Sequence, residues 1–186
     1  MKSLKNNRAA LSNVISTLII LVTSVLLAGV VTMYAVNITS TRTQQEALKV
    51  TKQAVWVYGN GTVYAALEID NVGGRDIVID KIQIRGVEVP WSNVYYTRLP
   101  SAISTSLNRP NATQSWSDFE YTSGETATFT NDTNDKPLTS GDTMILYIVN
   151  PESVSVSDVG ITIGITVFTQ NAQYYVECNV KSAEEV

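Results

Sequence analysis

The residues best suited to carry chemistry are four asparagines that each stand two positions before a threonine. This Asn-X-Thr spacing is the acceptor pattern for N-linked glycans on exported chains. It occurs at Asn37, Asn60, Asn111 and Asn131. Asn111 and Asn131 fall in segments typical of surface loops, and we expect glycans there. Asn60 is expected to serve a tight turn, and Asn37 stands in a predicted helix that neighbouring molecules could cover.

Other chemistry is poorly supported by the residue types present. The sequence lacks histidine, the commonest general base and transition-metal ligand, and its one cysteine, Cys178, fits a buried strand thiol. Asp132, Asn134 and Asp135 could offer oxygens to Ca²⁺, but their loop lacks the glycine and the distal glutamate of an EF-hand, which favours a solvated turn. We therefore predict no enzyme activity, no bound metal and no cofactor.

The elements that would position the sequons divide into an apolar N-terminal segment and a longer polar remainder. The chain has 186 residues, 44% of them hydrophobic and 16% charged, with a net charge of −4. This length suits one globular domain with an appendage. No cluster of Lys and Arg follows the first eight residues, which argues against nucleic-acid binding.

The N-terminal segment has the features of a membrane-inserted helix. Lys2, Lys5 and Arg8 precede an apolar stretch over residues 14–36, which exceeds the roughly 20 residues needed to cross a bilayer. The cations would keep that end in the cytoplasm. The stretch is too long for the apolar region of an ordinary secretory signal. Because residues 37–53 contain no Gly or Pro, we predict one helix from about Leu11 to about Val50, with an amphipathic second half.

Small side chains recur along this apolar segment and form a candidate packing stripe. They are Ser16, Ser24, Ala28, Gly29 and Thr32. Small residues let helix backbones approach closely where lipid gives no hydrophobic drive to associate. Scattered small residues are also common in any membrane helix, so the stripe alone does not decide between a packed helix and a single anchor.

The string Arg8-Ala9-Ala10-Leu11-Ser12-Asn13-Val14-Ile15-Ser16-Thr17-Leu18 resembles the processing region of archaeal type IV pilins and archaellins, which carry a class III signal peptide. The resemblance implies that a prepilin peptidase removes residues 1–9, with Arg8 and Ala9 before the cut. Ala10, or Leu11 one bond later, would be the new N-terminus. It also implies self-polymerisation, an assembly ATPase and a membrane platform protein. The family often has Pro where Asn13 stands, so the helix start should be less sharply fixed.

Beyond residue 51 the hydrophobic pattern alternates, as in β-strands. Asn60-Gly61 between alternating runs predicts a hairpin. Isoleucines at 77 and 79, then at 82 and 84, have opposite parity, which predicts a bulge near Asp80 and Lys81. Further strands are predicted at 143–149, 159–169 and 173–180. Residues 91–137 should form short strands and surface loops.

These patterns predict an α+β chain in which a long N-terminal helix (10–50) precedes an antiparallel, immunoglobulin-like β-sandwich (51–186). Residues 67–73 and 77–86 also resemble the β-sandwich of archaellins and archaeal pilins. Trp91, Tyr95 and Tyr96 could form an adhesive patch or cover the core of the sandwich, and we favour the core.

Three functions remain open at this point. The first is a pilin of an archaeal type IV pilus-like extracellular filament, inserted in the cell membrane as a precursor and serving adhesion. The second is an archaellin of the motility filament. The third, from a different class, is an unprocessed, membrane-anchored β-sandwich that binds a ligand, which would leave the processing string unexplained.

Overall fold

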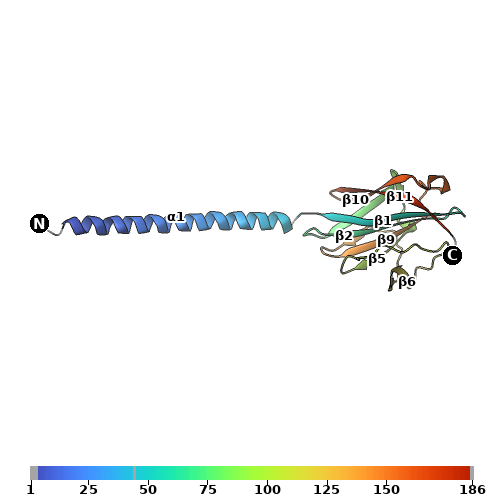
Figure 1. The fold of residues 1–186 in the computed structure, drawn as a ribbon, viewed down its shortest axis with the longest axis horizontal. Coiled ribbons are helices and arrows are strands. Elements are labelled where there is room, and N and C mark those ends of the chain that lie inside the picture. The colour runs from blue at the N-terminus through green and yellow to red at the C-terminus, as the bar shows by residue number, and fades with distance from the viewer. Residues whose placement is uncertain (1–3, 44, 185–186) are drawn as a thin grey trace. The chain divides into compact units, whose positions relative to one another are not determined.

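The computed structural model describes residues 4–43 and 45–184, with backbone alone at 4–10 and at 42–43. The chain divides into two compact units at the bond between Thr43 and Gln44. The first unit contains the helix α1 and the second a β-rich domain (Figure 1). The name "β-domain" denotes residues 45–184 of the second unit.

Helix α1 (Leu4–Thr43) is 40 residues long, or about 60 Å at 1.5 Å per residue. The prediction that helix continues to about Val50 was wrong, because β1 (Leu48–Tyr58) already includes residues 48–50. The backbone of residues 45–51 forms hydrogen bonds and strand pairs with the rest of the β-domain. The Val72 amide donates to the Ala47 carbonyl at 3.0 Å, the Gly74 amide donates to the Gln45 carbonyl at 3.1 Å, and Lys49 is paired with Asp70. These long-range hydrogen bonds outweigh the local helix propensity of the segment.

The β-domain contains eleven strands within its described residues. After β1 they are β2 (Val63–Asn71), β3 (Ile77–Ile84), β4 (Val87–Val89), β5 (Val94–Leu99), β6 (Phe119–Thr122), β7 (Glu125–Ala127), β8 (Lys136–Leu138), β9 (Thr143–Val149), β10 (Thr162–Thr169) and β11 (Gln173–Ala183). Two short 3-10 helices, η1 (Trp91–Asn93) and η2 (Val156–Asp158), interrupt the connections.

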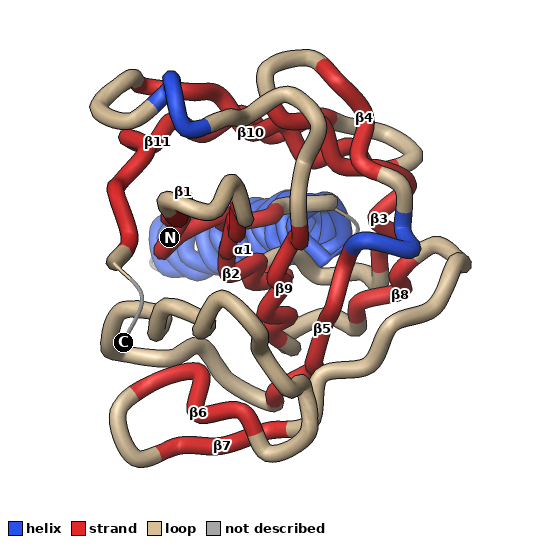
Figure 2. Tube along the Cα trace, turned by 90° about the vertical axis from the view of Figure 1, so that its right-hand side faces the viewer, coloured by secondary structure: helices blue, strands red, loops and turns tan. Residues whose placement is uncertain are grey.

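The strands form two packed layers, which confirms the predicted sandwich. One layer has the order β4-β3-β10-β11, with β8 also paired to β3, and the other has the order β1-β2-β9-β5 (Figure 2). The described pairings are antiparallel, apart from that of β1 with β11, which is parallel and joins the layers. The fold is therefore α+β, with a long helix followed by a mostly antiparallel sandwich.

Local turn chemistry in the β-domain agrees with the sequence patterns. β1 and β2 form the predicted hairpin, in which Gly61 has a φ of +89° and the Tyr58 amide donates to the Thr62 carbonyl. Along β3, Lys81 is paired with Phe168 but Ile79 with Thr169, so Asp80 is the extra residue of a bulge. This bulge keeps all four isoleucines of β3 buried.

Two hydrophobic cores hold the β-domain together. The first lies between the layers and includes Val55, Leu67, Ile82, Leu146 and Ile165, each at most 1% exposed. The second lies on the other face of the β1-β2-β9-β5 layer, where residues 99–130 and the β6–β7 hairpin cover it (Figure 2). β2 is consequently buried on both faces along its whole length.

The second core is built from aromatic side chains around Trp116. This indole stacks on Tyr95 with a centroid distance of 4.5 Å and also packs against Phe119, Phe129 and Tyr147. Trp91 and Tyr96 belong instead to the first core. The prediction that the Trp91, Tyr95 and Tyr96 side chains cover a core is confirmed.

Candidate functional site

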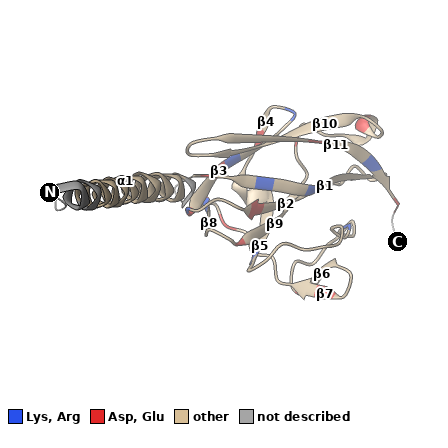
Figure 3. Cartoon of the chain, turned by 60° about the vertical axis from the view of Figure 1, so that its left-hand side comes forward, with Lys and Arg blue, Asp and Glu red and all other residues tan. Residues whose placement is uncertain are grey.

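The most extensive candidate surface is that of α1, which is apolar around its whole circumference. Residues 11–41 contain no charged side chain and are exposed throughout (Figure 3), and an 18-residue window within them has a mean hydropathy of 2.7. Leu27 and Val30 have exposed fractions of 66% and 67%. A helix that is apolar on every side is normally surrounded by lipid or by other helices. By length and composition, α1 is able to cross a membrane, as membrane anchors and signal sequences do.

The hydroxyl groups on α1 are arranged to tolerate apolar surroundings. Ser24 donates to the Ile20 carbonyl at 2.7 Å, and Thr32 donates to the Ala28 carbonyl at 2.7 Å. Thr17 and Thr23 bond the preceding turn in the same way. Because each of these four hydroxyls is satisfied within the helix, burying it in lipid or in a bundle leaves no unpaired donor at these positions.

The predicted packing residues lie along this exposed surface. Ser16, Ser24, Ala28, Gly29 and Thr32 are all exposed, and a methyl group placed on Gly29 would have no atom within 4 Å. The predicted processing residues Arg8, Ala9 and Ala10 lie in the helical backbone of α1. The helix runs through Asn13 without interruption, so no break in the helix marks the predicted cleavage bond.

Among the sequons, Asn131 and Asn60 use their side chains to hold local structure. The Asn131 amide group donates to the carbonyls of Ser92 and Val94 at 2.7 and 3.0 Å. The side-chain oxygen Oδ1 of Asn60 accepts from the Thr62 backbone amide at 2.9 Å and closes the β1–β2 turn. A glycan on Asn131 would have to displace these hydrogen bonds, since its link forms on the same nitrogen.

Asn111 and Asn37 are placed differently. Asn111 is exposed on the loop before β6, its backbone amide donates to Gln114 Oε1 at 3.0 Å, and its side-chain amide has no hydrogen-bond partner among the described residues. Asn37 is exposed on α1, within the apolar stretch. On Asn111, therefore, a glycan could be attached without displacing a hydrogen bond of the described side chain.

The Asp132 loop, considered above as an oxygen-rich cation site, holds a cation of the chain itself. The fully buried Lys136 ammonium donates to the Asp132 and Asn134 carbonyls and to the Asp132 carboxylate. It also lies 4.7 Å from the centroid of Trp91. The Lys136 hydrogen bond, then that of the Tyr96 hydroxyl, lowers the pKa of Asp132 to about 2. Asp135 is exposed and outside these contacts.

Cys178 is a structural residue of β11. It is half-buried and packs against the first core. Burial raises the pKa of its thiol to about 11, so the nucleophilic thiolate is scarce near neutral pH.

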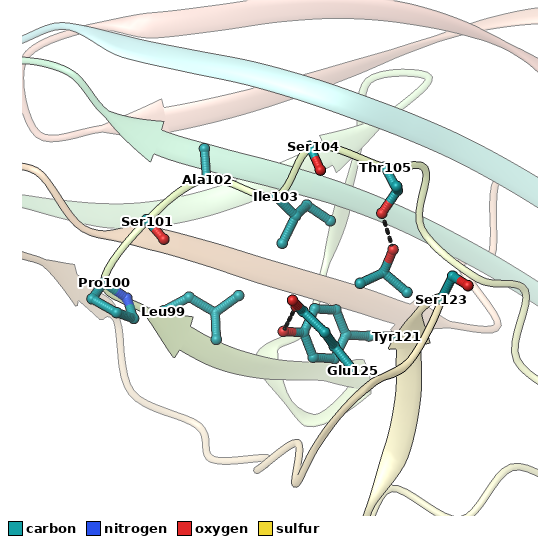
Figure 4. Close-up of a pocket in the computed structure, with 11 residues that line it drawn as sticks. Leu99, Pro100, Ser101, Ala102, Ile103, Ser104, Thr105, Tyr121, Ser123 and Glu125 are labelled. Carbon is teal, nitrogen blue, oxygen red and sulfur yellow. Dashed lines mark hydrogen bonds between the residues drawn. The ribbon is translucent and has the colours of Figure 1, made fainter.

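A groove of about 390 Å³ lies on the cover of the second core (Figure 4). One wall is the loop of residues 99–105, and the other consists of Tyr121, Thr122, Ser123 and Glu125. The Tyr121 hydroxyl donates to Glu125 Oε2 at 2.7 Å. Burial and this hydrogen bond raise the pKa of Tyr121 to about 12, so its hydroxyl stays protonated as the donor.

A partly buried ion pair fixes the loop wall of this groove. Glu68 is 1% exposed and accepts from the Ile103 amide at 2.7 Å, while Lys52 lies 3.1 Å from Glu68 and donates to the Ile103 carbonyl. Lys52 reaches this position from a bulge of β1, with a φ of +54°. On the other side, the Thr105 and Thr122 hydroxyls bond each other. Sequence patterns did not indicate this groove, because its walls are some 20 residues apart and lie in a segment without clear periodicity.

No family model and no curated protein matches the sequence. The fold, the helix surface and the β-domain groove are therefore the basis for any functional assignment.

Proposed function

We propose that the chain is a pilin, a structural subunit of an archaeal type IV pilus-like filament on the cell surface, and that it polymerises through α1. The observation that carries the proposal is the 31-residue uncharged stretch of α1, no side chain of which is buried within its own chain. All described residues of the two hydrophobic cores belong to the β-domain, so the packing of this domain does not depend on α1. An apolar surface of this size is covered by lipid before assembly and by copies of α1 afterwards.

The length of the helix is compatible with a filament core. About 20 apolar residues cross a bilayer as a helix, a length that the apolar run of residues 14–36 meets, and α1 continues beyond it to Thr43. Transfer from lipid to a helix bundle gains little hydrophobic free energy, because both surroundings are apolar. Extraction is therefore assigned to an assembly ATPase and its membrane platform protein, with close packing at Gly29 and the other small residues holding the product.

The processing string is closer to the pilin form than to the glycine-rich archaellin form, which favours an adhesion pilus over a motility filament. In the filament the β-domain faces water, where the exposed Asn111 carries a glycan. The archaellin and the uncleaved membrane-anchored module remain the competing functions.

The proposal is tested by blocking removal of the leader. Replacing both Ala9 and Ala10 by leucine keeps the helix and its apolar character but removes the small residues on either side of the predicted cut. We expect the uncut chain in the membrane fraction and no filaments by electron microscopy, whereas the control Asn7→Gln should assemble normally. Filaments built from uncut double-variant subunits would contradict processing, and a wild-type chain found only in membranes would favour the anchored module.

A further inference from the structure

We propose that the groove between residues 99–105 and the β6–β7 hairpin binds a saccharide. The inference rests on the proposed function in one respect only, that the β-domain is displayed outside the cell. It names the class of ligand that an adhesive β-domain would take, and the site lies wholly within that domain.

The groove is lined mainly by polar groups, with two larger aliphatic side chains among them. Figure 4 shows the side chains of Leu99 and Ile103 directed into the space that faces Tyr121 and Glu125. Ser101 and Ser104 lie along the loop wall, and their hydroxyls have no protein partner among the described residues. Its volume of about 390 Å³ is within the roughly 300–1,000 Å³ of small-ligand pockets.

Glu125 is the residue that would select the ligand. Its Oε2 accepts from Tyr121, so the carboxylate is held in one orientation and Oε1 is left to accept from a ligand. None of the eleven residues lining the groove is Lys or Arg. Anionic ligands therefore lack a counter-charge, while the hydroxyls of a sugar can donate to the carboxylate and exchange hydrogen bonds with the serines.

Two features that hold the groove walls in place cost free energy of folding. The buried Glu68 is paired with the partly exposed Lys52, and both side chains form a hydrogen bond with the backbone of Ile103. Burying an ion pair seldom adds stability over apolar side chains of the same volume. Lys52 also has a positive φ, a conformation that costs free energy in non-glycine residues. The ion pair and the Lys52 backbone conformation together hold the 99–105 loop in place. A wall that is already ordered loses less entropy when a ligand binds.

The test measures saccharide binding to the full chain, in detergent micelles or in sheared filaments. Glucose, galactose, mannose and N-acetylglucosamine are the probes, observed one at a time by saturation-transfer NMR. We expect at least one to bind the wild-type chain. Glu125→Gln should weaken it by about tenfold through loss of a charge-assisted hydrogen bond. Ser104→Phe, which places a ring on the loop wall, should abolish binding.

Glu88→Gln is the matched control, since it removes the same charge from an exposed position on β4 and should bind as the wild type does. Thermal unfolding of each variant verifies that it is folded. Absence of binding for all four sugars, or equal binding by the wild type and both groove variants, would overturn the saccharide site. Filament formation is scored separately by microscopy, so the failure of either proposal is distinguishable from that of the other.

Discussion

At the scale of single residues, the loop that sequence analysis weighed as a Ca²⁺ site and favoured as a solvated turn surrounds a buried lysine. The oxygens of Asp132 and Asn134 converge on the buried Lys136 ammonium, which also lies 4.9 Å from the Tyr96 ring. The sequence shows the oxygen-rich loop but does not show that Lys136 is buried within it, because a lysine in a polar loop is ordinarily expected to face solvent. Only the folded β-domain shows that Trp91 and Tyr96 cover it.

This arrangement predicts a defined acid sensitivity. The folded pKa of Asp132, about 2, lies below its ordinary value of 3.8, so the carboxylate stabilises the fold above about pH 4. That contribution is lost as the pH falls towards 2. Asp132→Asn should lower the free energy of unfolding by about 1 kcal/mol at pH 7, a value reduced by partial exposure of the carboxylate.

The measurement is urea unfolding of the full chain in detergent between pH 2 and pH 7. The difference between the wild type and Asp132→Asn should shrink as the pH falls from 4 to 2. Asp135→Asn, in the same loop but outside the Lys136 contacts, serves as the control. A difference that stays constant across this range would show that Asp132 does not stabilise the fold through its charge.

At the scale of elements, sequence patterns correctly predicted the turns and bulges that depend on neighbouring residues. The hairpin at Asn60 and the bulge at Asp80 depend on a few neighbouring residues, and both are present. The end of α1 was misplaced because residues 42–49 are good helix formers, while their partners around Val72 and Gly74 are distant in sequence. The second core was missed because Trp116, Phe119 and Phe129 are scattered through a Ser/Thr/Asn-rich segment, and because Glu68 and Asp70 gave β2 a half-polar pattern.

The segment of residues 45–47 provides a test at this scale. A methyl group on Gly73 would lie 2.6 Å from both the Ala47 nitrogen and the Gln45 oxygen, which are backbone atoms of a segment held by hydrogen bonds from the Val72 and Gly74 amides. Glu46 ties the same segment to the β10–β11 turn through Thr169 and Asn171. Gly73→Ala should therefore displace the segment and lower the free energy of unfolding by about 2 kcal/mol.

Hydrogen exchange and urea unfolding together check this expectation. Gly73→Ala should speed exchange at the amides of Val72 and Gly74, which donate to the segment. Gly59→Ala is the matched control, because its new methyl group meets no atom within 4 Å, and it should change stability by less than about 1 kcal/mol. Equal stability of the two variants would mean that the segment moves aside freely.

At the scale of the whole molecule, the proposed filament requires the apolar surface of α1 to lie in contacts between subunits. Gly29→Leu should leave folding and membrane insertion unchanged, because its side chain enters open space within one chain. In a closely packed bundle the same leucine meets a neighbouring helix, and the filament yield should fall at least tenfold. Val31→Leu, two residues away on the same exposed helix, should assemble almost normally.

Sheared filaments and membranes, quantified by immunoblotting, give the two readouts. A Gly29→Leu chain that assembles as well as Val31→Leu would remove Gly29 from the packing surface. Loss of membrane insertion by Gly29→Leu would point instead to an effect on the precursor.

The central claim is that the chain is processed and then polymerises through α1. Peptide mass spectrometry of the N-terminus, on filaments sheared from cells, tests it most directly. The account predicts a mature chain that begins at Ala10 or Leu11 and is abundant in the filament fraction. An intact Met1 confined to membranes, with none of this chain in the sheared fraction, would contradict it.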